Sequence, residues 1–496
     1  MIYIVIFMLL GIFSRTNSQD ALDPEQVSYR PATVAGAFYP ADPVELRKTI
    51  LEYLDEIKQT KKDYDIHGLV VPHAGYVFSG KTAAMAYKQL LGREYDAVII
   101  IAPSHVSAFA GSSVFKGDGY VTPLGVANVD KELAKSIAEA DDDISYSYDG
   151  HEWTGSRTEH SIEVQVPFLQ IVQPNVPIVP ISMGEQDDAC ANRLFKAIIL
   201  SAEKQDKKVL VVASTDLSHF HNLDRAEDLD MQVVSAFNRY DYFMMAYHLF
   251  NGKWEACGGG PMVVAMMAAE FLGANSSIVF DYSTSAKNKK YGDTSRVVGY
   301  MAGAMVYDKE AKLDDLPDLN DYERSKVIEA AKQGVKSAVL GKQIERDKSN
   351  LPKSLQGKYS AFVTITKNGK LRACMGHTFP QQQLIDEVKG VGKLAATSDY
   401  RFGVVRKEEL DSVEYEVSIM SRMRRIVDPM EVEPGEDGLY IRNGNKAGLL
   451  LPQVAAERNW DKKTFLENIC LKAGLPTSGY KDRNAEIYVF KAVIIH

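Results

Sequence analysis

The chain contains the stretch Val98-Ile99-Ile100-Ile101-Ala102-Pro103-Ser104-His105, an apolar run that ends in a histidine. The same pattern occurs at residues 69–73, which end in His73, and at residues 209–219, which end in His219. Each run is short, lies between helical patterns and predicts a buried strand of a parallel sheet. Because ligands bind at the carboxyl ends of such strands, we expect the three imidazole rings to meet at one edge of the sheet.

Helical and strand patterns alternate over residues 30–307, which predicts an α/β domain with a mostly parallel central sheet. The strands are expected at residues 66–71, 97–102, 176–182, 209–213, 277–282 and 297–306. Asp42-Pro43-Val44-Glu45 combines an N-cap residue, a proline at the first helical position and a glutamate at the third. This combination predicts a helix that begins there and ends near Gln59.

Residues 308–320 are acidic and poor in large apolar side chains, which predicts a linker between two domains. The remainder, residues 321–496, predicts a smaller α+β domain with helices at 322–340, 382–398 and 463–473. Asn368-Gly369 lies between two strand patterns and is a strong signal of a type I′ hairpin. Asn443-Gly444 gives a weaker hairpin signal.

The composition is that of an ordinary globular protein, with 496 residues, 45% hydrophobic and 25% charged. The length predicts two to four domains, since a domain has roughly 150 residues. The formal net charge of -9 argues against a general nucleic-acid binder, because such proteins neutralise phosphates with lysine and arginine. A small-molecule substrate or a protein is the expected partner.

Residues 1–13 form an apolar stretch of the length of a secretory signal core, and polar residues follow it. We expect residues 1–18 to be a signal peptide and the protein to be exported to the periplasm or another extracytoplasmic compartment. An uncleaved N-terminal anchor and an incidental N-terminus are the alternatives, and membrane contact is expected only through this leader. The four cysteines lack the spacing of a disulfide framework or a zinc ribbon, and in an oxidising compartment they should be buried, metal-bound or paired.

His73 and His105 are candidate ligands of one metal ion, because imidazole is the commonest protein ligand for first-row metals. Cys257 is the candidate third ligand, since the glycines that follow it permit close approach of the backbone and a thiolate is a strong soft ligand. The alternative is that the histidines are ordinary hydrogen-bonded residues and that Cys257 is a buried thiol.

Asp216 and His219 are the candidate catalytic residues. His219 is expected to act as a general base if it is not a ligand, and Asp216 is expected to orient an imidazole or a bound water. The segment Glu159-His160-Ser161-Ile162-Glu163 predicts that His160 and Glu163 share one face of a helix. This pair is expected to support the ligands, to form a rival ligand pair, or to belong to a structural hydrogen-bond network.

Five segments of the first domain, taken as a set, resemble the Memo family, which is similar in fold to the class III extradiol ring-cleaving dioxygenases. They are Val34-Ala35-Gly36-Ala37-Phe38-Tyr39-Pro40, Pro72-His73-Ala74-Gly75-Tyr76, Glu159-His160-Ser161-Ile162-Glu163, Ser214-Thr215-Asp216-Leu217-Ser218-His219 and Cys257-Gly258. The resemblance implies His73, His105 and Cys257 as metal ligands, with His219 at the acid/base position of the dioxygenases. Those enzymes place a carboxylate where this chain has Cys257, and a thiolate favours softer metals. We expect Fe(II), with copper as the alternative and zinc less favoured.

The second domain resembles the AMMECR family. The matching segments are Leu371-Arg372-Ala373-Cys374-Met375-Gly376, Asp399-Tyr400-Arg401-Phe402, Gly448-Leu449-Leu450-Leu451-Pro452-Gln453 and Cys470-Leu471-Lys472-Ala473-Gly474-Leu475. The first motif of that family usually has glycine at the position of Ala373. Memo-like, AMMECR-like and radical-SAM proteins are associated in bacteria as the AmmeMemoRadiSam system, and this implies a radical-SAM protein as a partner.

Four residues of the second domain form a separate candidate site, namely Arg372, Cys374, Asp399 and Arg401. Arginine forks bind carboxylate or phosphate, and Cys374 is a candidate nucleophile if its pKa is lowered. The alternative is a structural ion pair beside a buried thiol.

The leading hypothesis for function is a metal-dependent redox enzyme that acts on a small oxygenated or aromatic substrate. The second hypothesis is a non-enzymatic protein that binds a metal or a peptide in the same crevice, since enzyme folds persist without chemistry. The third hypothesis gives the chemistry to the second domain and substrate presentation to the first.

Overall fold

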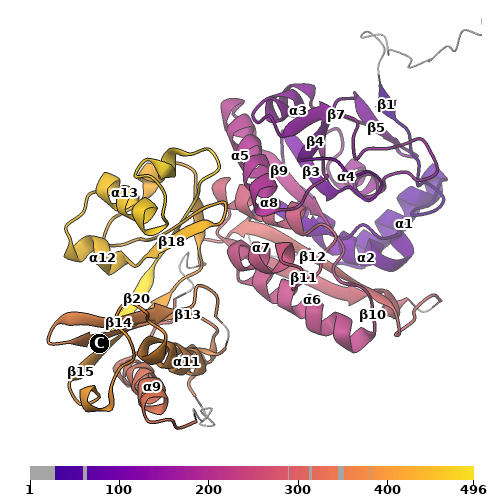
Figure 1. Ribbon diagram of the computed structural model, residues 1–496. Helices are drawn as coiled ribbons and strands as arrows, with labels where there is room; N and C mark the ends of the chain where they lie inside the picture. Colours follow the sequence, from indigo (N-terminus) through magenta and orange to yellow (C-terminus); the bar gives the residue numbers. More distant parts are fainter. Residues whose placement is uncertain (1–27, 60–63, 289, 312–315, 344–350, 381) are drawn as a thin grey trace, which may run out of the picture.

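The computed structural model describes residues 28–59, 64–288, 290–311, 316–343, 351–380 and 382–496. The predicted signal peptide, residues 1–18, lies outside them. A search of the described residues finds no helix that is both long and apolar enough to cross a membrane. Figure 1 shows a larger N-terminal domain and a smaller C-terminal domain with two lobes.

The first domain is built on a nine-stranded sheet of order β10-β12-β2-β9-β3-β8-β4-β7, with β11 paired to β12. Its strands are β2 (Asp65–Val71), β3 (Ala97–Pro103), β4 (Ser112–Phe115), β7 (Ile144–Ser147), β8 (Ile178–Met183), β9 (Val209–Ser214), β10 (His219–His221), β11 (Ser276–Thr284) and β12 (Val297–Tyr307). All six predicted strands are present. A smaller sheet contains β1 (Tyr29–Arg30), β5 (Gly119–Thr122) and β6 (Gly125–Asn128).

The prediction of a mostly parallel sheet holds only for the four central strands. β2, β9, β3 and β8 run parallel to one another. β12 runs antiparallel to both β2 and β11, and β4 runs antiparallel to β8. The edge strand β7 pairs with β4 in parallel, so the sheet as a whole is mixed, with antiparallel pairings on both sides of the central strands.

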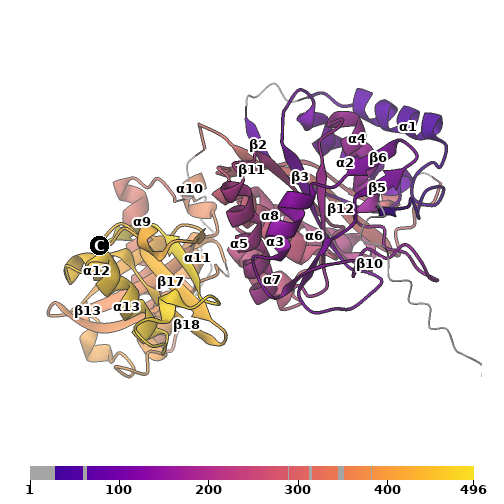
Figure 2. The same cartoon turned by 90° about the horizontal axis from the view of Figure 1, so that it is seen from above.

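Helices cover both faces of this sheet (Figures 1 and 2). They are α1 (Pro43–Asp55), α2 (Tyr76–Tyr87), α3 (Lys131–Ala138), α4 (Val166–Val172), α5 (Asp188–Lys204), α6 (Leu223–Asn238), α7 (Tyr242–Phe250) and α8 (Gly259–Phe271). Asp42 caps α1 as predicted, since its carboxylate accepts hydrogen bonds from Val44 N and Glu45 N at 2.9 Å, but the helix ends at Asp55 rather than near Gln59. α8 is apolar on nearly all sides and is buried against β9, β2 and β3.

The second domain contains two four-stranded sheets, which the sequence did not predict. One has the order β14-β13-β15-β20 and the other β16-β19-β17-β18. The strands are β13 (Ser360–Lys367), β14 (Lys370–Gly376), β15 (Val413–Met420), β16 (Arg424–Ile426), β17 (Gly438–Asn443), β18 (Lys446–Leu450), β19 (Glu486–Phe490) and β20 (Ala492–Ile495). The helices are α9 (Asp321–Val339), α10 (Lys353–Gln356), α11 (Leu384–Thr397), α12 (Pro452–Glu457) and α13 (Lys462–Lys472). Each sheet has its own hydrophobic core, so each forms one lobe.

Both predicted hairpins form. Asn368 and Gly369 have φ angles of 53° and 68° and connect β13 to β14, as a type I′ turn requires. In the second hairpin the strand extends one residue further than expected, because Asn443 pairs with Lys446 and the turn falls on Gly444 and Asn445.

The two domains share a packed interface. Phe243 of α7 stacks on Phe379 with ring centroids 5.2 Å apart and meets the edge of Tyr488 at 4.8 Å. Met420 and Phe490 of the second domain belong to the same hydrophobic cluster as the core of the first. In Figures 1 and 2, α5 and α7 lie on the side of the first domain that faces the second, whereas α1 lies on the far side.

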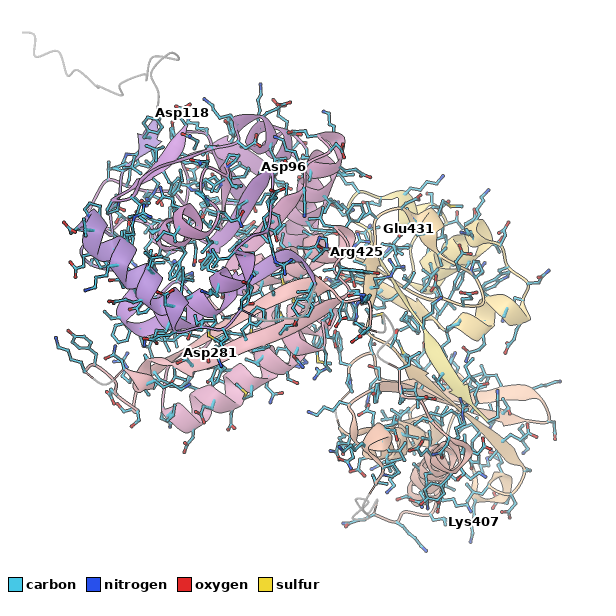
Figure 3. The ribbon with its side chains drawn as sticks, turned by 180° about the vertical axis from the view of Figure 1, so that it is seen from behind. Asp96, Asp118, Asp281, Lys407, Arg425 and Glu431 are labelled. Carbon is cyan, nitrogen blue, oxygen red and sulfur yellow. The ribbon has the colours of Figure 1, made fainter. Side chains whose placement is uncertain are left out.

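Buried polar groups cross this interface. The Tyr242 hydroxyl donates to Glu270 Oε2 and accepts a hydrogen bond from Arg425 N, both at 2.6 Å. The guanidinium of Arg425, which is labelled at the interface in Figure 3, donates to Asn192 Oδ1 at 3.0 Å. Arg442 Nη2 lies 2.7 Å from Asp188 Oδ1. These satisfied contacts fix the relative position of the domains.

Stability is expected to fall as the pH is lowered, in part because of His151. This ring is fully buried: Nε2–H donates to Ser113 O at 3.2 Å, and Nδ1 accepts from the Tyr120 hydroxyl at 2.6 Å. Burial lowers the pKa of His151 to about 3. In the unfolded chain the pKa of His151 is near 6.5, so between about pH 6.5 and pH 3 this ring is protonated in the unfolded state and neutral in the folded state. Over this range His151 lowers the free energy of unfolding by about 1.4 kcal/mol for each unit by which the pH falls.

Urea unfolding at pH 4, 5 and 6 checks this expectation in the wild type and in His151→Gln. In the variant the slope of the unfolding free energy against pH should be smaller by the amount that corresponds to about one bound proton. The slope is independent of any constant loss of stability that the substitution causes. An equal slope in both proteins would contradict the assignment.

Candidate metal centre

The parallel strands bring the candidate residues together. His73, His105 and Asp216 each lie two residues beyond the end of a strand, after β2, β3 and β9 respectively. These strands are neighbours in the order β2-β9-β3, so their carboxyl ends are adjacent, as the sequence predicted. Cys257 comes from the segment before α8, where the chain approaches closely: a Cβ atom at Gly258 would lie 2.4 Å from Ser214 O.

One nitrogen of His73, one nitrogen of His105 and the sulfur of Cys257 all lie within 4.8 Å of one another. His73 Nε2 lies 3.1 Å from Cys257 Sγ, and the His73 and His105 ring centroids are 5.1 Å apart. Ligands about 2.0 to 2.3 Å from one ion are separated by roughly 3 to 4 Å, so small adjustments would let these atoms share an ion. A second group, His105, Glu159 and His160, meets the same distance limit.

The hydrogen bonds of His73 fix its tautomer. Ser214 Oγ donates its single proton to Ser161 O at 2.6 Å and accepts from Gln165 Nε2 at 2.8 Å. The contact of 3.0 Å between Ser214 Oγ and His73 Nδ1 must therefore use a proton on Nδ1. This leaves the lone pair on His73 Nε2, the atom that faces Cys257.

His105 and His219 are held in the same way. His105 Nδ1 lies 3.1 Å from Glu159 Oε1, and His219 Nδ1 lies 2.8 Å from Leu217 O. A carboxylate and a carbonyl only accept, so both Nδ1 atoms carry protons, and in the neutral form of each ring the lone pair is on Nε2. Three imidazoles thus offer Nε2 with Nδ1–H anchored, which is the usual arrangement behind metal-binding histidines.

Burial dominates the electrostatics of the cluster. It lowers the pKa of His73 well below the usual value, assisted by the nearby His160 and His105, and it lowers the pKa of His160 to about 4. The pKa of His219 is also lowered by burial. Burial likewise raises the pKa of the Cys257 thiol far above its usual range, with a further contribution from Asp216. Without an ion, the rings of His73, His160 and His219 are therefore neutral and the Cys257 thiol keeps its proton.

Asp216 has a different contact from the one expected. Its Oδ1 accepts from His73 N at 2.8 Å, so its carboxyl group orients the backbone that carries His73. The imidazole of His219 bonds to Leu217 O instead of Asp216. Burial raises the pKa of Asp216 to about 7.

His160 and Glu163 are separated by the structure. His160 lies in a loop, not on a helix, and its ring stacks on His105 with centroids 4.9 Å apart, beside the predicted ligands. Glu163 begins a short 3₁₀ turn and points into a buried network with Arg30, Thr33, Val34 and Tyr39. Of the alternatives for this segment, the structural network describes Glu163.

Sequence reasoning assigned no role to Glu159 or Ser214, which orient His105 and His73. Glu159 accepts from His105 N at 2.6 Å, from the His105 ring, and from Ser161 N at 3.0 Å. Burial acts to raise the pKa of Glu159, but the hydrogen bond and charge of His105 and the backbone donors hold it well below its usual range. The available signal was the position of both residues inside the motifs that carry the family resemblance.

The candidate site of the second domain divides into two ion pairs. Arg372 forms a two-pronged contact with Glu409, at 3.1 and 3.0 Å, and donates to the carbonyls of Phe402, Gly403 and Val404. Its nitrogen donors thus connect β14 to the loop at residues 402–404 and to Glu409. Of the two alternatives predicted from the sequence, Arg372 therefore fits the structural ion pair.

Arg401 and Asp399 form the second pair, beside Cys374. The two nitrogens of Arg401 lie 2.9 and 2.7 Å from the Asp399 oxygens, and Asp399 Oδ2 accepts from Cys374 N at 2.9 Å. Burial raises the pKa of Cys374, although the nearby charges of Arg401 and Lys472 act to lower it. The thiol thus lacks the lowered pKa that the nucleophile hypothesis requires. All four cysteines are free, and Cys190 and Cys470 are buried.

The comparisons with known proteins divide the chain at the same place as the fold. Residues 30–304 match the family described as Memo-like protein, and residues 328–495 match AMMECR1. A MEMO1 family protein of Methanobrevibacter smithii is 37% identical over 285 residues, which is 55% of this chain and 98% of the relative. A MEMO1 family protein of Archaeoglobus fulgidus is 35% identical over 274 residues, which is 55% of this chain and 97% of the relative.

Among solved structures, an uncharacterized protein from Pyrococcus horikoshii is 32% identical and has a TM-score of 0.34, covering 36% of this chain and 92% of that one. An uncharacterized protein from Escherichia coli K12 is 14% identical with a TM-score of 0.31, covering 47% of this chain and 99% of that one.

Proposed function

This chain belongs to the Memo-like protein family, and from that premise we propose that its first domain is a metal-dependent redox enzyme related in fold to the class III extradiol dioxygenases. Its substrate is a small oxygenated or aromatic molecule. The observation that carries the proposal is the convergence of His73, His105 and Cys257 within 4.8 Å, with the Nδ1–H of each ring anchored.

The donor set suits a redox-active metal. Two imidazoles and one thiolate are softer than the two histidines and one carboxylate of non-haem iron oxygenases. We assign Fe(II) first, copper second and zinc third. When bound by His73, His105 and Cys257, iron or copper would supply electron transfer to or from a substrate beside it.

The chain itself supplies orientation and proton transfer. Glu159 and Ser214 hold the two ligand rings, and Asp216 holds the backbone of His73. His219 is the residue that moves a proton, because Leu217 O fixes its Nδ1–H and leaves Nε2 as the acceptor. Its lowered pKa keeps the ring neutral and able to act as a base.

The first test is the metal content of protein purified without oxygen, measured by mass spectrometry. We expect about one iron or copper ion per chain in the wild type and loss of that ion in Cys257→Ala, because a thiolate ligand is removed. Cys374→Ala is the matched control and should retain the ion. Absence of stoichiometric metal, or retention of it in Cys257→Ala, would overturn the assignment.

Oxygen uptake with catechols and phenols then tests the redox activity. His219→Gln should keep the metal and lose turnover. Tight metal binding without oxygen uptake by any of these substrates would favour the non-enzymatic alternative, in which the same crevice binds a metal or a peptide.

A further inference from the structure

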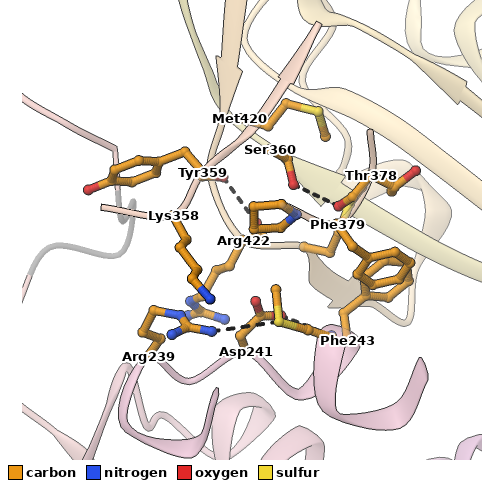
Figure 4. A pocket seen from close by; sticks show the side chains of 14 residues that line it. Arg239, Asp241, Phe243, Lys358, Tyr359, Ser360, Thr378, Phe379, Met420 and Arg422 are labelled. Atoms are coloured by element: carbon orange, nitrogen blue, oxygen red, sulfur yellow. Dashed lines mark hydrogen bonds between the residues drawn. The ribbon is translucent and has the colours of Figure 1, made fainter. Parts of the chain in front are cut away.

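A small pocket lies between the two domains, and its lining residues do not include the candidate metal ligands. The first domain contributes Arg239, Asp241 and Phe243, and the second contributes Lys358, Phe379 and Arg422. Figure 4 shows the charged ends of Arg239, Lys358 and Arg422 pointing toward one another beside Asp241. Side chains of both domains therefore build one positively charged site.

Arg422 is the buried part of this site. Its side chain is 6% exposed, and its Nη1 lies 2.7 Å from Glu270 Oε1. Its Nη2 is buried and has no hydrogen-bond partner among the described residues. A buried donor without a partner lowers stability, so a ligand that accepts a hydrogen bond from it would be bound favourably.

The charges around the pocket do not balance. Glu270 pairs with Arg422, and Asp241 is the second carboxylate, which accepts from Met244 N at 3.0 Å as the N-cap of α7. Arg239 donates to the neutral atoms Ser235 Oγ and Met244 Sδ. Three cations thus meet two carboxylates, which leaves an excess of one positive charge where the domains touch.

We propose that this pocket binds a small oxyanion, a phosphate or a carboxylate, which bridges the two domains. Guanidinium groups match the geometry of both anions, and an ammonium adds a point charge. The stacked rings of Phe243 and Phe379 form an apolar border of the pocket. Because the anion contacts both domains, its binding stabilises their association and raises the melting temperature of the whole chain.

Calorimetric titration of the full chain with inorganic phosphate at constant ionic strength tests the proposal. We expect saturable binding of one anion per chain and an increase in melting temperature. Lys358→Gln and Arg239→Gln should each weaken binding about tenfold or more, since each removes a charge-assisted hydrogen bond. Lys370→Gln and Arg225→Gln change exposed cations outside the pocket and should leave the affinity unchanged.

A parallel titration with acetate separates the two anion classes. Cys257→Ala should bind phosphate normally, which distinguishes this pocket from an anion bound at the metal. Lys358 is exposed, so its variant should fold, and circular dichroism checks this. Lack of saturable binding of both anions by the wild type, or equal affinity in Lys358→Gln and Arg239→Gln, would overturn the proposal.

Discussion

Replacing Glu163 by alanine is expected to lower the free energy of unfolding by about 3 to 5 kcal/mol, because it removes the opposite charge that is paired with a buried arginine. Arg30 and Glu163 are 1% and 0% exposed, and their charged atoms lie 2.5 Å apart. Glu163 Oε1 also accepts from Val34 N at 3.0 Å and from the Tyr39 hydroxyl at 2.6 Å. The substitution therefore removes several hydrogen-bond acceptors at once, and it leaves the guanidinium of Arg30 with backbone carbonyl acceptors but without its ion pair.

Urea unfolding monitored by circular dichroism measures the loss. Glu203→Ala replaces an exposed glutamate on α5 and should change stability by no more than about 0.5 kcal/mol. The folded fraction of Glu163→Ala should retain its metal, since Glu163 belongs to neither group of clustered ligand atoms. A loss of stability below about 1 kcal/mol would contradict the role of the buried ion pair. Loss of metal from the folded protein would mean that Glu163 contributes to the metal site.

The features that the sequence predicted are local or periodic. A type I′ turn at Asn368-Gly369 depends on adjacent residues, and a buried strand such as β3 shows itself as a continuous apolar run. The meeting of His73 and His105 followed from one further rule, that neighbouring parallel strands end at the same edge. The antiparallel direction of β12 could not be predicted, because it depends on which strands lie next to β12 in the folded chain.

The supporting hydrogen bonds were missed for a related reason. Ser214 is 141 residues from His73 in the sequence, and Glu159 is 54 residues from His105. Neither pair has a spacing that a motif rule could use. The same applies to Arg422 and Glu270, which meet only because the two domains pack together. For Arg372, closeness in the sequence led to a wrong expectation. Its position two residues from Cys374 suggested a shared reactive site, but the Arg372 guanidinium pairs with Glu409.

Replacing Glu159 by glutamine is expected to weaken metal binding about 10- to 100-fold, the usual effect of removing a group that orients a ligand. The Glu159 carboxylate accepts from His105 Nδ1 at 3.1 Å and from the backbone N atoms of His105, His160 and Ser161. All of these partners are donors, so an amide NH₂ group at this position would face another N–H. The His105 ring would lose either its anchor or its orientation.

Competition with a chromophoric chelator under anaerobic conditions measures the dissociation constant. Glu255→Gln is the control, because Glu255 lies two residues from Cys257 but pairs with His221 at 2.9 Å and should leave the affinity within about twofold. Unchanged affinity in Glu159→Gln would mean that His105 does not bind the metal.

The two substitutions together also separate the rival ligand groups. If the ion is held by His105, Glu159 and His160, then Glu159→Gln removes a ligand and abolishes stoichiometric binding, whereas Cys257→Ala retains the metal. If the ion is held by His73, His105 and Cys257, then Cys257→Ala abolishes binding and Glu159→Gln only weakens it. The tautomers favour the second outcome, because Glu159 accepts the Nδ1 proton of His105 and is thereby engaged in holding the ring whose Nε2 is free.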